Sequence, residues 1–320
     1  MTKRLASVGN LVDLLILPSD REIIDPNGSA SISIPLAALD PSHPEIPGFL
    51  KNEILKQRHY HNFIADGVST GHLKLVKEAF RDAAYKFTSK LPLPSFAGFV
   101  FEAFTIRALN YNLDMRGRAI AWSSNRRNVG KGFASKFKAI GTGLPETKTK
   151  YANLYAPQDP MDVKFVQERY HKITREYYFD ILEIMGTNLP AGIQVKAITG
   201  SEKSEIIEPI LSGRYFRVLT YLRHADGLHS YYECMRILEN MHKAGEIGLE
   251  ERMRVADAIK SPELLGISQS VVDDYYGYIK HAHRGMIDGD DLVWQGAELE
   301  IKFHKGGGGI LVPDTLGESD

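Results

Sequence analysis

The chain has 320 residues, with 39 Lys and Arg against 40 Asp and Glu, 43% apolar residues and a single cysteine. This composition is typical of a folded globular protein and excludes a mainly disordered chain. The formal net charge of −1 excludes a protein that coats nucleic acid or anionic membranes by bulk charge. One cysteine allows no intramolecular disulfide, and no stretch of about 18 apolar residues predicts a membrane helix, so we expect a cytoplasmic protein without membrane contact.

Residues 1–90 predict an N-terminal α/β segment. The alternating run 31–34 lies between turn signals and is typical of a strand. Between residues 72 and 90, apolar side chains recur at spacings of three and four, which predicts an amphipathic helix. Pro92 and Pro94 then end that helix, so we place a domain boundary at 90/91.

Residues 91–245 contain the elements that we expect to form a central α/β core. Ser95 is suited to cap a helix that runs to Leu109, with Glu102 among aromatic residues. The run 191–198 is the clearest buried strand of the chain. The elements expected after it are a helix at 204–211, a strand at 215–222 and a helix at 229–242.

Two further segments complete the predicted organisation. Residues 161–185 fit helical spacing but also read as runs rich in aromatic and β-branched residues, so helix and strand both stay open there. Residues 246–320 form a mainly helical C-terminal segment. Its expected elements are helices at about 249–260 and 268–284 and a strand at 299–303.

Gln194 and Lys196 are the polar pair on the clearest strand. Alternate residues of a strand share a face, so both side chains point the same way, while Ile193 and Val195 point to the other. Burying an unpaired lysine in an apolar strand is costly, which favours a functional role for Lys196. The alternative is an edge strand whose polar face simply meets water.

In this order of elements the chain resembles the restriction-endonuclease-like nucleases, the PD-(D/E)XK superfamily. In that pattern a helix carries a glutamate, a strand carries an aspartate, the next strand carries acid-x-Lys, and a helix and another strand follow. The corresponding residues here are Glu102, then Asp162 or Asp180, then Gln194 and Lys196. Gln194 replaces the usual acid, as in the Gln-x-Lys variant of Mrr-like branches, and the resemblance covers about residues 95–240.

The resemblance implies a restriction-endonuclease-like mixed β-sheet core flanked by helices, with N-terminal and helical C-terminal extensions. It further implies a Mg²⁺ or Mn²⁺ site in which Asp162 is the main ligand, Gln194 offers an amide oxygen and Glu102 binds directly or through water. Lys196 would orient the attacking water and stabilise the charge of the transition state. Asp180 is the alternative ligand; we prefer Asp162 because a proline-containing turn precedes it.

The segment 116–138 contains no Asp or Glu and is the predicted DNA-binding region. Its cations are Arg116, Arg118, Arg126, Arg127, Lys131, Lys136 and Lys138. Trp122, Phe133 and Phe137 are available there to stack on bases or to anchor the segment. The alternative is an ordinary solvated surface, for which these charges need no ligand.

We therefore expect a metal-dependent DNA endonuclease of a restriction system or of bacterial antiviral defence. By the same resemblance it would act as a homodimer or within a defence complex. The second hypothesis is a non-catalytic DNA-binding or scaffold subunit on the same fold, which the replacement of the acid by Gln194 favours. A third is an unrelated α/β enzyme with a small substrate.

Overall fold

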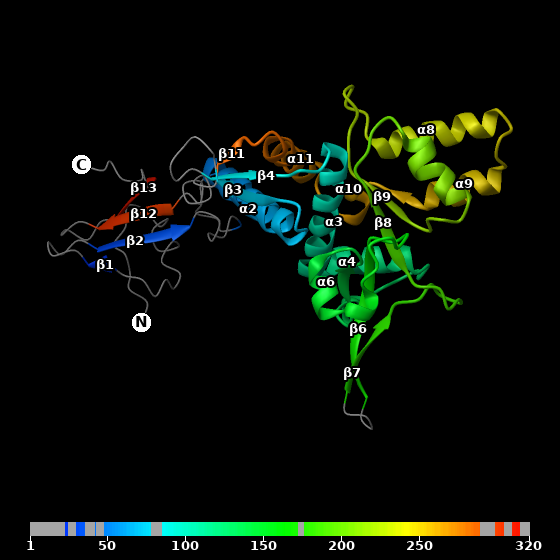
Figure 1. Ribbon diagram of the computed structural model, residues 1–320, viewed down its shortest axis with the longest axis horizontal. Coiled ribbons are helices and arrows are strands. Elements are labelled where there is room, and N and C mark those ends of the chain that lie inside the picture. The colour runs from blue at the N-terminus through cyan, green and yellow to red at the C-terminus, as the bar shows by residue number, and fades with distance from the viewer. Residues whose placement is uncertain are drawn as a thin grey trace. The chain divides into compact units, whose positions relative to one another are not determined.

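The computed structural model describes residues 23–24, 30–35, 42, 48–77, 85–171, 176–288, 298–303 and 309–313. The chain folds into two compact units (Figure 1). Unit 1 comprises Met1–Asn62, Leu75–Thr88 and Gly285–Asp320, and unit 2 comprises Phe63–Lys74 and Ser89–Arg284. Both contain helices and strands, so the predicted mixed α/β class is confirmed.

The strands from both ends of the chain pair with one another in unit 1. The order of one sheet is β1 (Ile23–Ile24), β2 (Ala30–Pro35), β12 (Glu298–Phe303), β13 (Gly309–Pro313). The order of the other is β11 (Ile287–Asp288), β4 (Tyr85–Thr88), β3 (Lys74–Lys77). The strands predicted at 31–34 and 299–303 are thus confirmed.

The helix predicted over residues 72–90 is wrong for the two described parts of this range, while residues 78–84 lie outside the described residues. β3 and β4 are strands, and the helix of this region is α2, Gly48–Ser69. The spacing of apolar residues imitated a helix, but β4 pairs with β11, which lies about 200 residues later in the chain. A strand pairing between segments so far apart in the chain cannot be recognised from the local sequence. The pairing with β11 therefore made this segment a strand although its apolar spacing is that of a helix.

Unit 2 is built on a mixed open sheet with the order β10, β9, β8, β6, β5, and β7 pairs with β6. The strands are β5 (Lys138–Gly141), β6 (Val163–His171), β7 (Glu176–Ile181), β8 (Gly192–Lys196), β9 (Val218–Thr220) and β10 (Ile259–Lys260). β8, β9 and β10 run parallel, while β5, β7 and β8 are antiparallel to β6. The strands predicted at 191–198 and 215–222 are therefore present, the second only over its centre.

The segment 161–185, for which helix and strand were both open, forms the hairpin β6 and β7. Val163 and Phe165 of β6 are fully buried, and β5 and β8 pair with the first residues of this strand on either side. Backbone pairing on both edges satisfies polar groups that a buried segment cannot leave free. Of the two alternatives, the strands indicated by the aromatic and β-branched composition of this segment are present, and the helix indicated by its apolar spacing is not.

Helices cover the sheet of unit 2. They are α3 (Leu93–Tyr111), α4 (Leu113–Ser123), α5 (Lys131–Ala134), α6 (Pro145–Lys150), η2 (Ala152–Leu154), η3 (Lys203–Ile207), α7 (Glu208–Leu211), α8 (Ser230–Lys243), α9 (Leu249–Asp257), α10 (Pro262–Leu265) and α11 (Gln269–His283). α3 begins two residues before Ser95, so Ser95 lies in its first turn and is not its cap. No helix among the described residues is long and apolar enough to cross a membrane.

Residues 246–284 belong to unit 2, whereas the sequence predicted a boundary at 245/246. Val255 of α9 and Ile259 of β10 share one buried cluster with Ile207, Val218 and Leu238. β10 also extends the sheet beside β9. Removing this segment would expose the apolar surface of α8, so the unit continues to Arg284.

The α3–α4 corner is held by a buried arginine. Arg116 is 8% exposed, and its guanidinium donates to the carbonyls of Leu109, Asn110 and Phe137 at 2.8, 2.5 and 2.7 Å. These bonds join the end of α3 to the residue just before β5. Arg116 therefore has a structural role in this corner, although it also lines a surface pocket, and its predicted role as a DNA contact stays a prediction.

We expect Arg116→Met to lower the free energy of unfolding by about 2–4 kcal/mol, because three carbonyls lose a charged donor inside the protein. Urea unfolding followed by circular dichroism measures this. Arg127→Met, at an exposed position of the same segment, is the matched control and should change stability by less than about 0.5 kcal/mol. Equal stability of the two variants would contradict the anchoring role of Arg116.

Candidate functional site

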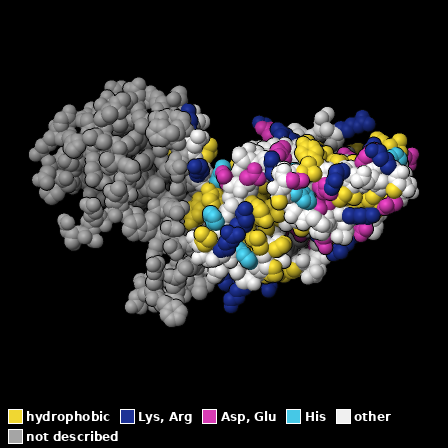
Figure 2. All heavy atoms as spheres, turned by 90° about the horizontal axis from the view of Figure 1, so that it is seen from above, with side chains coloured by type: hydrophobic (Ala, Val, Ile, Leu, Met, Phe, Trp, Pro, Cys, Tyr) yellow, Lys and Arg dark blue, Asp and Glu magenta, His cyan; other side chains and the backbone are white. Residues whose placement is uncertain are grey.

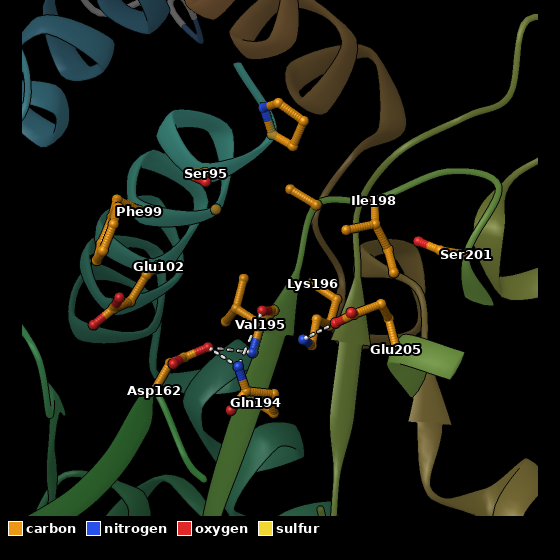
Figure 3. Close-up of a pocket in the computed structure, with 13 residues that line it drawn as sticks. Ser95, Phe99, Glu102, Asp162, Gln194, Val195, Lys196, Ile198, Ser201 and Glu205 are labelled. Carbon is orange, nitrogen blue, oxygen red and sulfur yellow. Dashed lines mark hydrogen bonds and ion pairs between the residues drawn. The ribbon is translucent and has the colours of Figure 1, made fainter. Parts of the chain in front are cut away.

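A pocket of about 510 Å³ lies where α3, the start of β6, the end of β8 and the turn into η3 meet (Figure 3). Its polar lining includes Glu102 of α3, Asp162, Gln194 and Lys196 of β8, and Glu205 of η3. Four of these are residues predicted from the sequence. They come from segments far apart in the chain, and the sheet order places them together.

Glu102 is buried in α3, with 5% of its surface exposed. The absence of a side chain at Gly141 makes room for it, because a Cβ at that position would lie 2.7 Å from Glu102 Oε1. Oε1 has no hydrogen-bond partner. Burial, and then the nearby charge of Asp162, raise the pKa of this carboxyl well above its usual range, while the Gly143 N–H lowers it.

Asp162 immediately precedes β6 and is bonded to β8. Its Oδ2 accepts hydrogen bonds from the Val195 backbone N–H at 2.8 Å and from the Gln194 amide at 2.6 Å. Burial is the largest cause that raises the pKa of Asp162 to about 6, against the lowering effect of the Val195 N–H and of Lys196. Glu102 and Asp162 are thus two buried carboxyl groups that resist being charged together.

Lys196 stands on a central strand, because β8 lies between β6 and β9. The alternative of a solvated edge strand is therefore excluded. Its side chain is 15% exposed, its Nζ lies 3.0 Å from Glu205 Oε2, and its charge lies 5.2 Å from the ring centre of Tyr215. The ammonium group is consequently held at the wall of the pocket by a carboxylate and an aromatic face.

Glu205 is absent from the set of site residues predicted from the sequence. It follows Lys196 by nine residues and lies in η3, the helix that comes after the key strand. About half of its side chain is exposed, at 52%. The sequence did show an acidic residue in the first turn of the helix after that strand. It could not show that this residue reaches Lys196, because the contact depends on the conformation of the turn at 198–201.

Asp180, the alternative metal ligand, lies outside this pocket. It belongs to β7, opposite Gln167 of β6, and forms an ion pair with Arg169 at 2.6 Å. It lines a different, open pocket of about 860 Å³. The structure therefore brings Asp162, and not Asp180, to Glu102, Gln194 and Lys196.

The remaining cations of the predicted DNA-binding segment are spread over different surroundings. Lys131 pairs with Asp114 at 3.1 Å, and Lys138 with Glu146 at 3.8 Å. Arg126 donates to the carbonyl of Glu183. The other members, Arg118, Arg127 and Lys136, are exposed. On the face shown in Figure 2, Lys and Arg side chains are interspersed with Asp and Glu, so the described surface there has no block of one sign.

Two of the aromatic residues for which stacking on bases and anchoring were both open are buried. Trp122 is 7% exposed and Phe137 is 8% exposed. The indole N–H of Trp122 donates to the carbonyl of Asp257 at 2.9 Å, and the ring of Phe137 packs against that of Phe133. Trp122 and Phe137 therefore act as anchors, which was the other role considered for them.

The donor set of the pocket is suited to a hard divalent cation. Among the described residues, no group of three or more His, Cys, Asp and Glu side chains converges into a metal site. Glu102 and Asp162 nevertheless offer carboxylate oxygens, and Gln194 offers an amide oxygen, which are the ligands that Mg²⁺ takes. The unpartnered Glu102 Oε1 and the mutual repulsion of the two carboxylates are features that a bound cation relieves.

Comparison of the chain with models of protein families, with curated proteins and with solved structures gave no significant match. The geometry of the pocket is therefore the basis for the functional proposal that follows.

We expect Glu102→Gln to raise the melting temperature of the metal-free protein at pH 8 by a few degrees, because it removes one of two repelling buried charges. A raised carboxyl pKa means that the folded state binds a proton more tightly than the unfolded chain. The stability that this group contributes is present at low pH and is lost as the pH rises through the folded pKa. The gain of the variant should therefore shrink at pH 5.

Thermal unfolding in the presence of a chelator, at pH 5 and pH 8, measures this difference. Glu205→Gln is the control, since Glu205 is half exposed and paired with Lys196, and its removal should bring no gain at pH 8. A lower melting temperature of Glu102→Gln at pH 8 would show that the carboxylate is stabilising and would contradict the repulsion argument.

Proposed function

We propose that this protein is a metal-dependent DNA endonuclease with a restriction-endonuclease-like core. The carrying observation is the convergence of Glu102, Asp162, Gln194 and Lys196 in one pocket. The order of elements supports it: α3 with the glutamate, β6 preceded by the aspartate, β8 with Gln-x-Lys, then η3 with α7, and β9. The resemblance implies that the acid-x-Lys strand directly follows the aspartate strand, whereas here β7 lies between them in the chain and β8 is the neighbour of β6 in the sheet.

Asp162, Glu102 and the amide oxygen of Gln194 would hold the cation. A bound Mg²⁺ or Mn²⁺ would neutralise charge on the phosphate and lower the pKa of a water molecule. In the metal-free arrangement, the Gln194 amide nitrogen faces Asp162 Oδ2. Rotation of this amide by half a turn would present its oxygen instead.

Lys196 would supply the fixed positive charge beside the reacting phosphate. Its ion pair with Glu205 is partly exposed and hence readily exchanged for another anion. Ser95 and Gly98 line the same pocket from the first two turns of α3, where the helix end is positive. Lys196 and this helix end together favour a phosphodiester over a neutral substrate.

The test compares two aspartates. Plasmid DNA is incubated with Mg²⁺ or Mn²⁺ and the wild type, Asp162→Asn or Asp180→Asn, and loss of the supercoiled form is followed. Asp162→Asn should lower the rate about 100-fold or more, because it removes the buried anionic ligand. Asp180→Asn, outside the pocket, should cleave like the wild type. Supercoiled DNA that survives the wild type with both ions would refute the proposal.

Lys196→Ala should lower the cleavage rate by about 100- to 1,000-fold, as loss of a positioned charge does in other active sites. Lys203→Ala is the matched control, since Lys203 lies on the same helix as Glu205 but pairs with Glu246 away from the pocket. Mn²⁺ should still raise the melting temperature of Lys196→Ala, because its carboxylates are intact. Equal cleavage by both lysine variants would remove Lys196 from the mechanism.

A non-catalytic DNA-binding or scaffold subunit is the second candidate. The observation that favours it is the Gln194 amide, which donates to Asp162 and so satisfies the carboxylate without a cation. This candidate predicts DNA binding without cleavage and no shift of the melting temperature by Mg²⁺ or Mn²⁺. A shift in the wild type that is lost in Asp162→Asn would exclude it.

In the nucleases that the chain resembles, two pockets usually cut the two strands of a duplex, so the proposal extends to a homodimer or to a place in a restriction or antiviral defence complex. A cytoplasmic location belongs to the same proposal. Light scattering of the purified protein measures the oligomeric state directly, and a strict monomer that cuts both strands at one position would contradict the dimer.

A further inference from the structure

The β6–β7 hairpin presents a row of aromatic side chains on one face. Residues directly opposite each other in an antiparallel pair share a face, which applies to Tyr170 with Tyr177 and to Glu168 with Phe179. The rings of Tyr170 and Tyr177 lie 5.0 Å apart, and Phe179 meets the ring of Tyr151 at 4.7 Å. Tyr170 is 49% exposed and Tyr177 is 68% exposed. Figure 1 shows the hairpin extending away from α8 and α9.

Cations stand beside this row. A pocket of about 430 Å³ has a lining that includes four cations, two aromatic rings and one acid: Arg116, Lys136, Lys138, Lys150, Tyr151, Phe179 and Glu168. Lys138 and Lys150 both pair with Glu146, at 3.8 and 2.9 Å, so one carboxylate is shared by two ammonium groups. The ammonium of Lys138 also lies 5.9 Å from the ring centre of Tyr151. The lining of this pocket therefore combines an excess of positive charge with the aromatic rings of Tyr151 and Phe179.

This combination fits one class of partner. Exposed aromatic rings stack on unpaired bases, and lysines track the phosphates between them. In a duplex the bases already stack on each other, so the rings would be left without partners. An acidic peptide would satisfy the lysines but would leave the row of rings unused. The surface is therefore complementary to a single strand of nucleic acid.

The register of the sheet relates this surface to the catalytic pocket. Lys138 of β5 pairs with Val166 of β6, four residues along the strand from Asp162. At about 3.3 Å per residue that separation is about 13 Å, and Tyr170 lies about 26 Å from Asp162.

We propose that the aromatic face of the hairpin, formed by Tyr170, Tyr177 and Phe179 with Lys136, Lys138 and Lys150 beside it, binds single-stranded nucleic acid next to the cleavage pocket. The inference rests on the proposed function for the presence of a cleavage pocket, which acts on duplex DNA, whereas the strand bound here is an unpaired stretch beside it. The binding itself requires no hydrolysis. The surface would hold a strand by stacking and charge, without reading its sequence.

The test measures binding without cleavage. A fluorescent 20-nucleotide oligo(dT) and a 20-base-pair duplex are titrated in EDTA and followed by anisotropy. The variant Tyr170→Ala/Tyr177→Ala should weaken binding of oligo(dT) about tenfold or more, with the salt dependence unchanged, because stacking is lost and phosphate contacts remain. Tyr177→Phe keeps the ring and should bind like the wild type.

Lys136→Glu should weaken oligo(dT) binding and also reduce the slope of log K against log salt, because a phosphate contact is lost. Lys243→Glu on α8 is the matched control at an exposed lysine outside the surface, and it should leave both quantities unchanged. Circular dichroism of each variant establishes that it is folded.

Three results would overturn the proposal: wild-type binding by the double tyrosine variant, equal affinity for the duplex and the single strand, or displacement of oligo(dT) by poly-glutamate at equal charge. Failure of the nuclease proposal looks different. If the wild type binds oligo(dT) through Tyr170 and Tyr177 but cuts no DNA with Mg²⁺ or Mn²⁺, the binding surface stands and the nuclease is refuted.

Discussion

The Asp162 carboxylate is the interaction on which the candidate site depends. Backbone pairing between β6 and β8 is limited to Val163 with Ile193 and Lys164 with Gly192. Beyond these two pairs, the Asp162 side chain replaces the backbone as the hydrogen-bond acceptor for β8. Its Oδ2 accepts hydrogen bonds from the Val195 N–H and from the Gln194 side-chain amide. A carboxylate therefore continues the junction between two strands, and it is buried because of that position.

This junction explains why the site is both strained electrostatically and rigid. Glu102 is held beside Asp162 by the packing of α3, where Gly141 leaves room for its oxygen. Burial raises the pKa of both carboxyl groups, and the charge of Asp162 raises that of Glu102 further. Their negative charge can be relieved by protons, by a cation or by a positive side chain. Lys196 already offsets part of this negative charge, because its ammonium group lowers the pKa of Asp162. A stable fold that keeps such an arrangement is more readily explained by chemistry than by packing.

The two surfaces of unit 2 that we propose for nucleic acid differ in character. The pocket concentrates buried acids, one lysine and a positive helix end, which suits the reaction at a phosphate. The hairpin offers exposed rings and lysines, which suits the binding of a flexible strand. Neither needs a large excess of positive charge over the whole molecule, which agrees with the balance of 39 cationic and 40 acidic residues.

The sequence by itself determined the parts that are encoded locally. The apolar run of β8, with Gln194 and Lys196 on one face, and the helices from Ser230 to Lys243 and from Gln269 to His283 were predicted because their side-chain periods are regular. Local order also placed Glu102 on a helix and Asp162 ahead of the key strand.

Only the tertiary structure decided the remainder, because it depends on contacts between distant segments. Pairing with β11 made β4 a strand where the periodicity indicated a helix. Burial gave Arg116, Trp122 and Phe137 contacts inside the fold that their place in a basic, acid-free segment did not indicate. The turn after β8 brought Glu205 to Lys196, and the path of β7 kept Asp180 away from Asp162. Charge and residue type are local properties of a chain, whereas burial and proximity are set only when the sheet is assembled.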